Sequence, residues 1–234
     1  MKFPSPLIPA TLIRRYKRFL ADVILPNGEE VTVHTPNTGA MLGCAEPGSR
    51  IWLHDTANPK RKYPLAWELS TSTEGVIIGV NTHLVNRLVQ EGIENGVIEG
   101  LQGYREIRQE VRYGEENSRI DLLLQHPGRA DCYVEIKSVT LVRNGVAAFP
   151  DAVSQRGTRH LRELMSQVRK GDRAVLLFCV QREDADSMEA AADIDPVYAA
   201  TLRQAFEQGV EIMAYRASVN PGEIRLQHAL PVRC

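Results

Sequence analysis

Two short apolar segments, residues 119–124 and 132–137, constrain the fold of this chain more than any other feature. Both are rich in Leu, Ile and Val, and a short turn containing Pro127 and Gly128 separates them. Apolar segments of this length between turn residues are typical of strands. The turn is too short for a crossover connection, so we expect the two strands to be antiparallel neighbours in one sheet.

Three charged residues, Asp121, Glu135 and Lys137, lie inside these apolar strands. A pairing centred on Gly128 places Asp121 opposite Glu135, and side chains in that relation have Cβ atoms about 4.5–5.5 Å apart. Glu135 and Lys137 share one face because side chains alternate along a strand. A buried charge without a partner is costly. The hairpin therefore predicts two carboxylates and one ammonium group at a single place.

This combination of charges suits a divalent metal ion and a phosphate group. Mg²⁺, for which Mn²⁺ is the usual substitute, prefers carboxylate oxygens and takes its other ligands from water and phosphate. Asp121 and Glu135 are the candidate metal ligands. Together with Lys137, which would hold the attacking water, they are the candidate catalytic residues. Glu110, on the preceding expected strand, is either a third carboxylate of this site or an exposed charge beside Arg108 and Arg112. The alternative is a cross-strand salt bridge in which Lys137 lies between the two acids.

Charge and cysteine content exclude several classes of protein. The 234 residues suffice for one large or two small domains, and the net charge of −1 excludes a globally basic nucleic-acid-binding protein. The four cysteines are widely scattered, without the spacing of a zinc site, and predict a reducing, cytoplasmic setting. We expect neither a signal peptide nor a membrane-spanning segment.

Positive charge is concentrated in several short clusters. Such clusters are more often solvated surface than binding sites, but here several of them flank the candidate phosphate site in the sequence. We therefore expect a basic groove that takes DNA as its partner. The candidate DNA-binding residues are Arg14, Arg15, Lys17, Arg18, Lys60, Arg61, Lys62, Arg119, Arg156, Arg159 and His160. For His160 the alternative is a pair with a neighbouring acid.

Residues 1–81 predict a small β-barrel domain. Turns separate the expected strands, which are 10–16, 19–25, 30–34, 49–54, 65–69 and 76–80. Short strands at this density, without a helical pattern between them, are typical of a closed barrel of the OB type. The turn-rich segment 36–43 is either a ligand-binding loop or a plain connection. Trp52, Trp67 and Tyr63 either stack on bases or, like most aromatics of small barrels, belong to the core.

Residues 82–234 predict an α/β domain. Apolar residues at helical spacing predict helices over 82–92, over 151–169 with Asp151 as its N-cap, and over 196–208. Besides the hairpin, strands are expected at 107–113, 173–181 and 210–216. The nearly continuous apolar sequence of 173–181 is typical of a central strand covered on both faces. The fold class is α/β (α+β overall).

Six stretches of the sequence resemble a known protein family. They read LIRRYKRFLADV at 12–23, PNTGAM at 36–41, KRKYP at 60–64, YGEENSRID at 113–121, VEIKSVTL at 134–141 and FPDAVSQRGTRHLREL at 149–164. The chain resembles the sugar fermentation stimulation protein (SfsA-like) family along essentially its whole length. The resemblance implies an OB-like N-terminal domain followed by a C-terminal domain similar to the PD-(D/E)XK nucleases.

The resemblance also implies function. It implies largely non-specific DNA binding, with a proposed regulatory role in maltose metabolism, and the nuclease pattern falls on Asp121, Glu135 and Lys137. One position departs from that pattern, because Ile120 precedes Asp121 where the motif has proline. The first expectation is a DNA-binding protein that grips phosphates with little base readout. The alternative is a Mg²⁺-dependent DNA nuclease.

Overall fold

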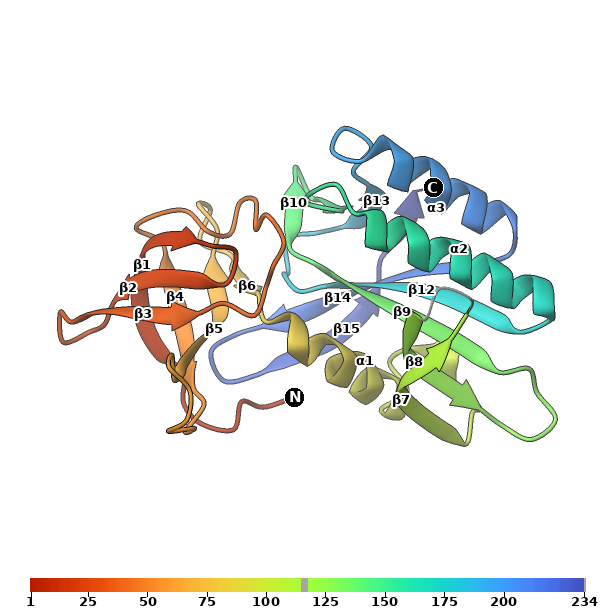
Figure 1. The fold of residues 1–234 in the computed structure, drawn as a ribbon, viewed down its shortest axis with the longest axis horizontal. Coiled ribbons are helices and arrows are strands. Elements are labelled where there is room, and N and C mark those ends of the chain that lie inside the picture. Colours follow the sequence, from red (N-terminus) through yellow and green to blue (C-terminus); the bar gives the residue numbers. More distant parts are fainter. Residues whose placement is uncertain (115–117, 234) are drawn as a thin grey trace.

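The computed structural model describes residues 1–114 and 118–233, which form two packed domains (Figure 1). The N-terminal domain consists of strands alone. The C-terminal domain combines helices with a large central sheet, and both faces of that sheet are apolar and buried. The expected fold class, an OB-like barrel followed by a mixed α/β domain, is confirmed.

The N-terminal domain is a six-stranded, mostly antiparallel sheet in which five strands close into a barrel. Its strands are β1 (Ile8–Tyr16), β2 (Leu20–Ile24), β3 (Glu30–His34), β4 (Arg50–Asp55), β5 (Leu65–Thr71) and β6 (Ile77–Gly79). The order is β3-β2-β1-β4-β5-β6, and a parallel bridge between His34 and Ala66 joins β3 to β5 and closes the barrel. Alternating residues of these strands fill the interior. Trp67 is fully buried in the barrel interior, which confirms the core interpretation for it. Trp52 is nearly buried too, but in the apolar cluster that it shares with α1 and the central sheet of the other domain.

The C-terminal domain is built on a second six-stranded sheet with the order β15-β14-β12-β9-β8-β7. These strands are β7 (Glu106–Tyr113), β8 (Ser118–Gln125), β9 (Cys132–Val139), β12 (Arg173–Val180), β14 (Glu211–Val219) and β15 (Ile224–Ala229). Strand β12 runs parallel to both of its neighbours, β9 and β14. Its buried apolar residues therefore occupy the middle of the sheet, as the sequence predicts.

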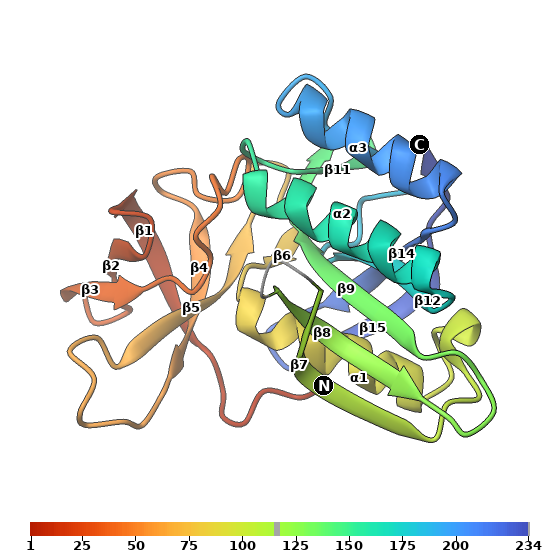
Figure 2. The same ribbon diagram turned by 45° about the vertical axis from the view of Figure 1, so that its right-hand side comes forward.

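Helices cover both faces of this sheet (Figure 2). The single-turn helix η1 (Thr82–Leu84) leads into α1 (Val85–Glu94), which packs on one face together with the turn η2 (Glu99–Leu101). The opposite face is covered by α2 (Gln155–Lys170) and α3 (Pro196–Glu207). Among the described residues, no helix is both long and apolar enough to span a membrane.

Four short strands form a third sheet that the sequence does not predict. They are β10 (Leu141–Arg143), β11 (Val146–Phe149), β13 (Ser187–Ala190) and β16 (Val232–Arg233), in the order β10-β11-β13-β16. Each is too short to show a clear alternation of apolar and polar residues. β10 and β11 form a local hairpin around Asn144-Gly145, whereas β13 and β16 are defined as strands only by pairing with segments distant in the sequence.

The expected start of the second helix is wrong. Helix α2 begins at Gln155, and the side chain of Ser154, not Asp151, caps it by accepting a hydrogen bond from the N–H of Gly157 at 3.0 Å. Asp151 has another partner, because its Oδ2 accepts a hydrogen bond from the N–H of Met41 in the barrel domain at 2.8 Å. The carboxylate that the local sequence predicts as a helix cap thus forms a hydrogen bond between the two domains instead.

Two further contacts fix the barrel domain against the α/β domain. The N–H of Gly79 donates to the carbonyl of Gln181, at the end of β12, at 2.9 Å. A Cβ at Gly79 would lie 2.6 Å from Oε1 of Gln181, so the close approach requires glycine there. The hydroxyl of Thr82 donates to the carbonyl of Pro36 at 3.0 Å. Together with the contact between Met41 and Asp151, these bonds hold the two domains in one arrangement.

Candidate functional site

A cavity of about 1120 Å³ lies between the two domains. The barrel domain contributes the turn between β1 and β2 and the loop 37–40. The α/β domain contributes the start of α1, the segment 135–141 of β9 and β10, and the segment 148–156 that leads into α2. Asp121, Glu135 and Lys137 line this cavity, and so does Glu110. The structure thus brings the residues of the predicted site to one place.

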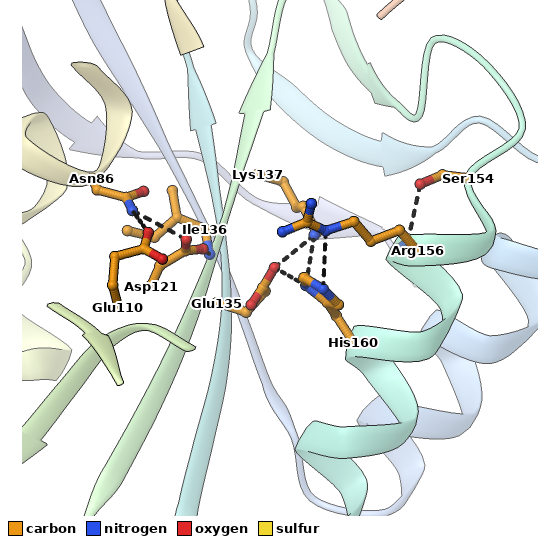
Figure 3. A network of polar contacts seen from close by, with 10 residues as sticks. Asn86, Glu110, Asp121, Glu135, Ile136, Lys137, Ser154, Arg156 and His160 are labelled. Atoms are coloured by element: carbon orange, nitrogen blue, oxygen red, sulfur yellow. Dashed lines mark hydrogen bonds and ion pairs between the residues drawn. The ribbon is translucent and has the colours of Figure 1, made fainter. Parts of the chain in front are cut away.

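The β8–β9 hairpin positions Asp121 at the end of its ladder. The paired residues run from Leu124–Cys132 to Leu122–Val134, so the same register would place Asp121 opposite Glu135, as predicted. The backbone pairing of β8 with β9 ends at Leu122, and Asp121 contacts β9 through its side chain instead. Its Oδ2 accepts a hydrogen bond from the N–H of Ile136 at 2.7 Å (Figure 3). Its Oδ1 accepts one from Nδ2 of Asn86, on α1, at 3.1 Å.

Glu135 is buried on the side of β9 that faces α2, and only 2% of it is exposed. Its Oε1 accepts a hydrogen bond from Nζ of Lys137 at 2.7 Å and is also hydrogen-bonded to Nδ1 of His160. On the other edge of that ring, Nε2 of His160 accepts a hydrogen bond from Nε of Arg156 at 3.3 Å. Among the described residues, the second oxygen of Glu135, Oε2, has no hydrogen-bond partner although it is buried.

The environments of the two carboxylates shift their pKa values in opposite directions. Burial, and secondarily the negative charge of Glu135, raise the pKa of Asp121 to about 7. Burial also acts to raise the pKa of Glu135, but the charge of Lys137 and the bond to His160 outweigh it. The pKa of Glu135 therefore lies below its ordinary value. The site holds one ionised carboxylate and one that titrates near neutrality.

Glu110 lies on β7 beside Asp121. The flanking pairs of β7 and β8 are Gln109–Leu122 and Val111–Ile120, and Glu110 itself has a φ of +54°. That conformation is costly for a residue other than glycine and is frequent at functional sites. Its Oε1 accepts a weak hydrogen bond from Nδ2 of Asn86 at 3.4 Å, so one amide joins two carboxylates.

Three of the predicted basic residues line the cavity, namely Arg15, Arg18 and Arg156, as does His160. The guanidinium group of Arg15 donates to the carbonyls of Asn37 and Gly39 at 3.0 and 2.8 Å and thus holds the cavity wall. The remaining candidates lie outside the cavity lining, and Arg14 forms an ion pair with Asp22. These remaining candidates are Arg14, Lys17, Lys60, Arg61, Lys62, Arg119 and Arg159.

Models of two domains of one family match this sequence. The SfsA N-terminal OB domain matches residues 13–80, and the sugar fermentation stimulation protein RE domain matches residues 83–223. Two curated relatives with the printed description sugar fermentation stimulation protein homolog align over the full length. The protein of Shewanella halifaxensis is 53% identical and covers all of both chains, and that of Pelobacter propionicus is 60% identical over 99% of both. The chain belongs to the SfsA family.

The fold is also that of a solved SfsA protein. The structure of Pyrococcus furiosus SfsA in complex with Ca²⁺ aligns with a TM-score of 0.91 at 30% identity, over 100% of this chain and 98% of that one. A complex of EndoMS with double-stranded DNA aligns with a TM-score of only 0.32 at 14% identity, and no argument rests on it.

The residues present in this SfsA chain fit a divalent cation. The described residues contain no group of three or more His, Cys, Asp or Glu side chains arranged to hold a metal ion. However, Oε2 of Glu135 is buried without a hydrogen bond. The carboxylate of Asp121 accepts a hydrogen bond from the N–H of Ile136, the residue that follows Glu135. A buried carboxylate oxygen without a donor is costly, and a cation would satisfy it.

Sequence reasoning missed Asn86 and did not settle the role of the loop at 36–43. Asn86 lies on the polar side of a helix, where nothing in the local pattern separates it from a solvated residue. Asn37, Thr38 and Gly39 of the loop form part of the cavity wall. Gly39 allows this close packing, because a Cβ there would lie 2.8 Å from both carboxylate oxygens of Asp151, but the sequence alone does not show that contact.

Proposed function

We propose that this SfsA chain binds DNA through its phosphates and cleaves phosphodiester bonds with the help of a divalent cation. The observation that carries the proposal is the buried, unpartnered Oε2 of Glu135 in a cavity that also contains Asp121 and Lys137. Arginines at the rim and carboxylates at the floor match a phosphate above a metal ion. The Ca²⁺ complex of the Pyrococcus furiosus relative supports a divalent cation.

Asp121 and Glu135 would hold the cation. A divalent cation in such a site neutralises charge on the phosphate and lowers the pKa of water. Mg²⁺ is the proposed ion, with Mn²⁺ as its substitute, because both accept carboxylate and phosphate oxygens. The hydrogen bonds from Ile136 and Asn86 orient the carboxylate of Asp121 toward this position.

The other side chains of the cavity have distinct tasks. Lys137 presents its ammonium group 2.7 Å from Glu135, where it can orient a water molecule and donate to a phosphate oxygen. His160 fixes the rotamer of Glu135, and Arg156 in turn fixes the His160 ring. Arg18, at the rim and exposed, is placed to bind a phosphate without contacting a base.

A plasmid-nicking assay tests the proposal. Supercoiled plasmid incubated with the protein and Mg²⁺ or Mn²⁺ should be nicked, and EDTA should stop the reaction. Glu135→Gln should lower the rate by at least about 100-fold, because removal of a metal-supporting group costs this much or more. Glu207→Gln, an exposed acid on α3, is the matched control and should keep the wild-type rate. Intact plasmid at every metal concentration would exclude cleavage.

A second candidate function is DNA binding without cleavage, in a regulatory role such as that in maltose metabolism. Lys137 pairs with Glu135 and His160 is hydrogen-bonded to it, so one oxygen of Glu135 has its partners without a bound cation, and this favours the second candidate. If the protein binds DNA without cleaving it, the plasmid stays intact. The logarithm of the binding constant should then fall linearly and steeply with the logarithm of the salt concentration. Binding that is indifferent to salt would contradict both candidates.

A further inference from the structure

The turn between β1 and β2 presents two cations and an aromatic ring at its tip. Lys17, Arg18 and Phe19 form this turn, and all three are exposed. Lys17 and Arg18 have φ values of +49° and +64°, a conformation for which glycine or asparagine is normal. Two successive residues in this costly conformation, both with long charged side chains, indicate that the tip of the turn has a function, since backbone strain is concentrated at binding sites.

The backbone of this turn is fixed on both sides. Nη2 of Arg15 donates to the carbonyl of Arg18 at 2.6 Å. The N–H of Thr35 donates to the carbonyl of Phe19 at 2.9 Å. The side chain of Phe19 nevertheless remains 48% exposed. Among the exposed large apolar side chains of the described residues, Phe19 and Phe206 are the aromatic ones. The backbone beneath Phe19 is thus held in place, and about half of its ring faces solvent.

The turn lies at the mouth of the candidate catalytic cavity. Arg18 lines the cavity together with Glu135 and Lys137, and in Figure 1 the turn at the end of β1 points toward the α/β domain. Val153, which is 71% exposed, also lines it from the segment that leads into α2. Phe19 itself does not line the cavity, but it follows Arg18 directly in the chain and so lies beside the cavity mouth.

Contacts between the domains hold the two walls of the cavity in place. The loop 37–40 cannot move away from the α2 segment without breaking the bond between Met41 and Asp151, and Gly39 packs directly on Asp151. The volume of about 1120 Å³ is slightly above the range of small-ligand pockets, about 300–1,000 Å³. A space of this size can take a short segment of one strand, whereas duplex DNA is stiff, with a persistence length of about 150 base pairs, and cannot bend a few nucleotides into it.

We propose that the DNA which enters this cavity is single-stranded, with Phe19 stacked on an unpaired base and Arg18 on a neighbouring phosphate. This inference rests on the proposed function and adds the class of substrate to it. The phosphate must reach the cavity floor, because Glu135 is almost completely buried. A strand with free bases can follow the phosphate into the cavity and offer a base face to Phe19, whereas the bases of a duplex are already stacked on one another.

Binding measured by fluorescence anisotropy in EDTA tests the inference independently of catalysis. The probes are a labelled single-stranded oligonucleotide and the blunt duplex of the same length. Wild type should bind the single strand at least about tenfold more tightly than the duplex. Phe19→Ala should weaken single-strand binding about 5- to 150-fold, the range for loss of one stacked base, and leave duplex binding unchanged.

Two further variants separate stacking from a general loss of surface. Phe206→Ala removes the other exposed aromatic ring, on α3, and should bind the single strand like wild type. Phe19→Trp should restore tight binding, and its added tryptophan fluorescence should be quenched by the single strand but not by the duplex. Thermal melting of each variant should match wild type, since both rings are largely exposed.

The outcomes distinguish this inference from the proposed function. Equal affinity for single strand and duplex, or an unchanged affinity of Phe19→Ala, overturns the inference and leaves the proposed function standing. The absence of binding to either probe overturns both. Preference for the single strand that depends on Phe19, with or without plasmid nicking, supports the assigned substrate class.

Discussion

The two carboxylates beside β9 are neighbours but have opposite environments. Glu135 faces α2 and shares one oxygen between Lys137 and His160, so it stays ionised. Asp121 faces α1, where its hydrogen bonds come from the amide groups of Ile136 and Asn86, and burial raises its pKa to about 7. The difference teaches that one carboxylate is neutralised within the protein, while the other depends on a proton or a bound cation.

The largest expected effect comes from removing the ammonium group of Lys137, which pairs with Glu135. Lys137→Met should destabilise the protein by roughly 3 kcal/mol, because it leaves a buried carboxylate without its ammonium partner. Urea unfolding in EDTA measures this loss. Arg143→Met is the matched control, since it breaks the ion pair with Asp193 in which both side chains are exposed. The control should lose less than about 1 kcal/mol. Equal losses would show that Glu135 does not depend on Lys137.

Addition of a cation should stabilise the protein through both carboxylates. At 100 times the dissociation constant, Ca²⁺ should raise the free energy of unfolding by about 2.7 kcal/mol, and EDTA should remove the gain. Unfolding with and without CaCl₂ measures it. Asp121→Asn and Glu135→Gln should each lose the gain, whereas Glu207→Gln should keep it. Stabilisation of all the variants to the same extent would place the cation elsewhere.

The raised pKa of Asp121 makes a signed prediction about pH. The folded protein keeps the proton up to about pH 7, whereas the unfolded chain releases it near pH 3.9. Stability from this group is therefore present below that lower value and is lost as pH rises through about 7. Without metal, Asp121→Asn should be more stable than wild type above pH 7, on the order of 1–3 kcal/mol. The difference between their urea midpoints should grow from acid to neutral pH. A constant difference would contradict the raised pKa.

The smallest expected effect is at Asn86. Its amide stabilises the ionised form of Asp121, so Asn86→Ala should raise the pKa of Asp121 further. The loss of stability should be about 0.5–1 kcal/mol above pH 8 and smaller below about pH 5, where Asp121 is protonated. Unfolding at the two pH values checks this. A larger loss on the acid side would show that Asn86 supports the helix and not the carboxylate.

The sequence predicts those parts of the site that depend on neighbouring residues. The length of one turn sets the register that brings Asp121 next to Glu135, and alternation along β9 brings Lys137 beside Glu135. Alternation fails for Asp121, which does not share the face of Glu135: its carboxylate is hydrogen-bonded to Asn86 of α1, whereas Glu135 faces α2. The OB-like barrel is predicted for a similar reason, because each strand is bounded by its own turn residues. The assignments of these residues to catalysis and metal binding stay predictions.

The sequence does not predict what depends on distant segments. Asp151 looks like a helix cap because its true partner, the N–H of Met41, is 110 residues away. The role of Asn86 and the strands β13 and β16 are defined in the same way, by contacts with remote parts of the chain. Arg15 is basic in the sequence, but its guanidinium group is largely engaged by the loop carbonyls. Local composition carries no information about such partners.

The hydrogen bond between Asp151 and Met41 controls the shape of the cavity without taking part in the network of the candidate catalytic groups. It sets the distance between the cavity walls, yet neither residue belongs to the hydrogen-bonding network of Glu135 and Asp121. Substitutions at Asp151 or Gly39 can therefore change which strands are admitted while the chemical groups keep their geometry. Selection among nucleic acids and the rate of the reaction can in this way evolve at different positions of one chain.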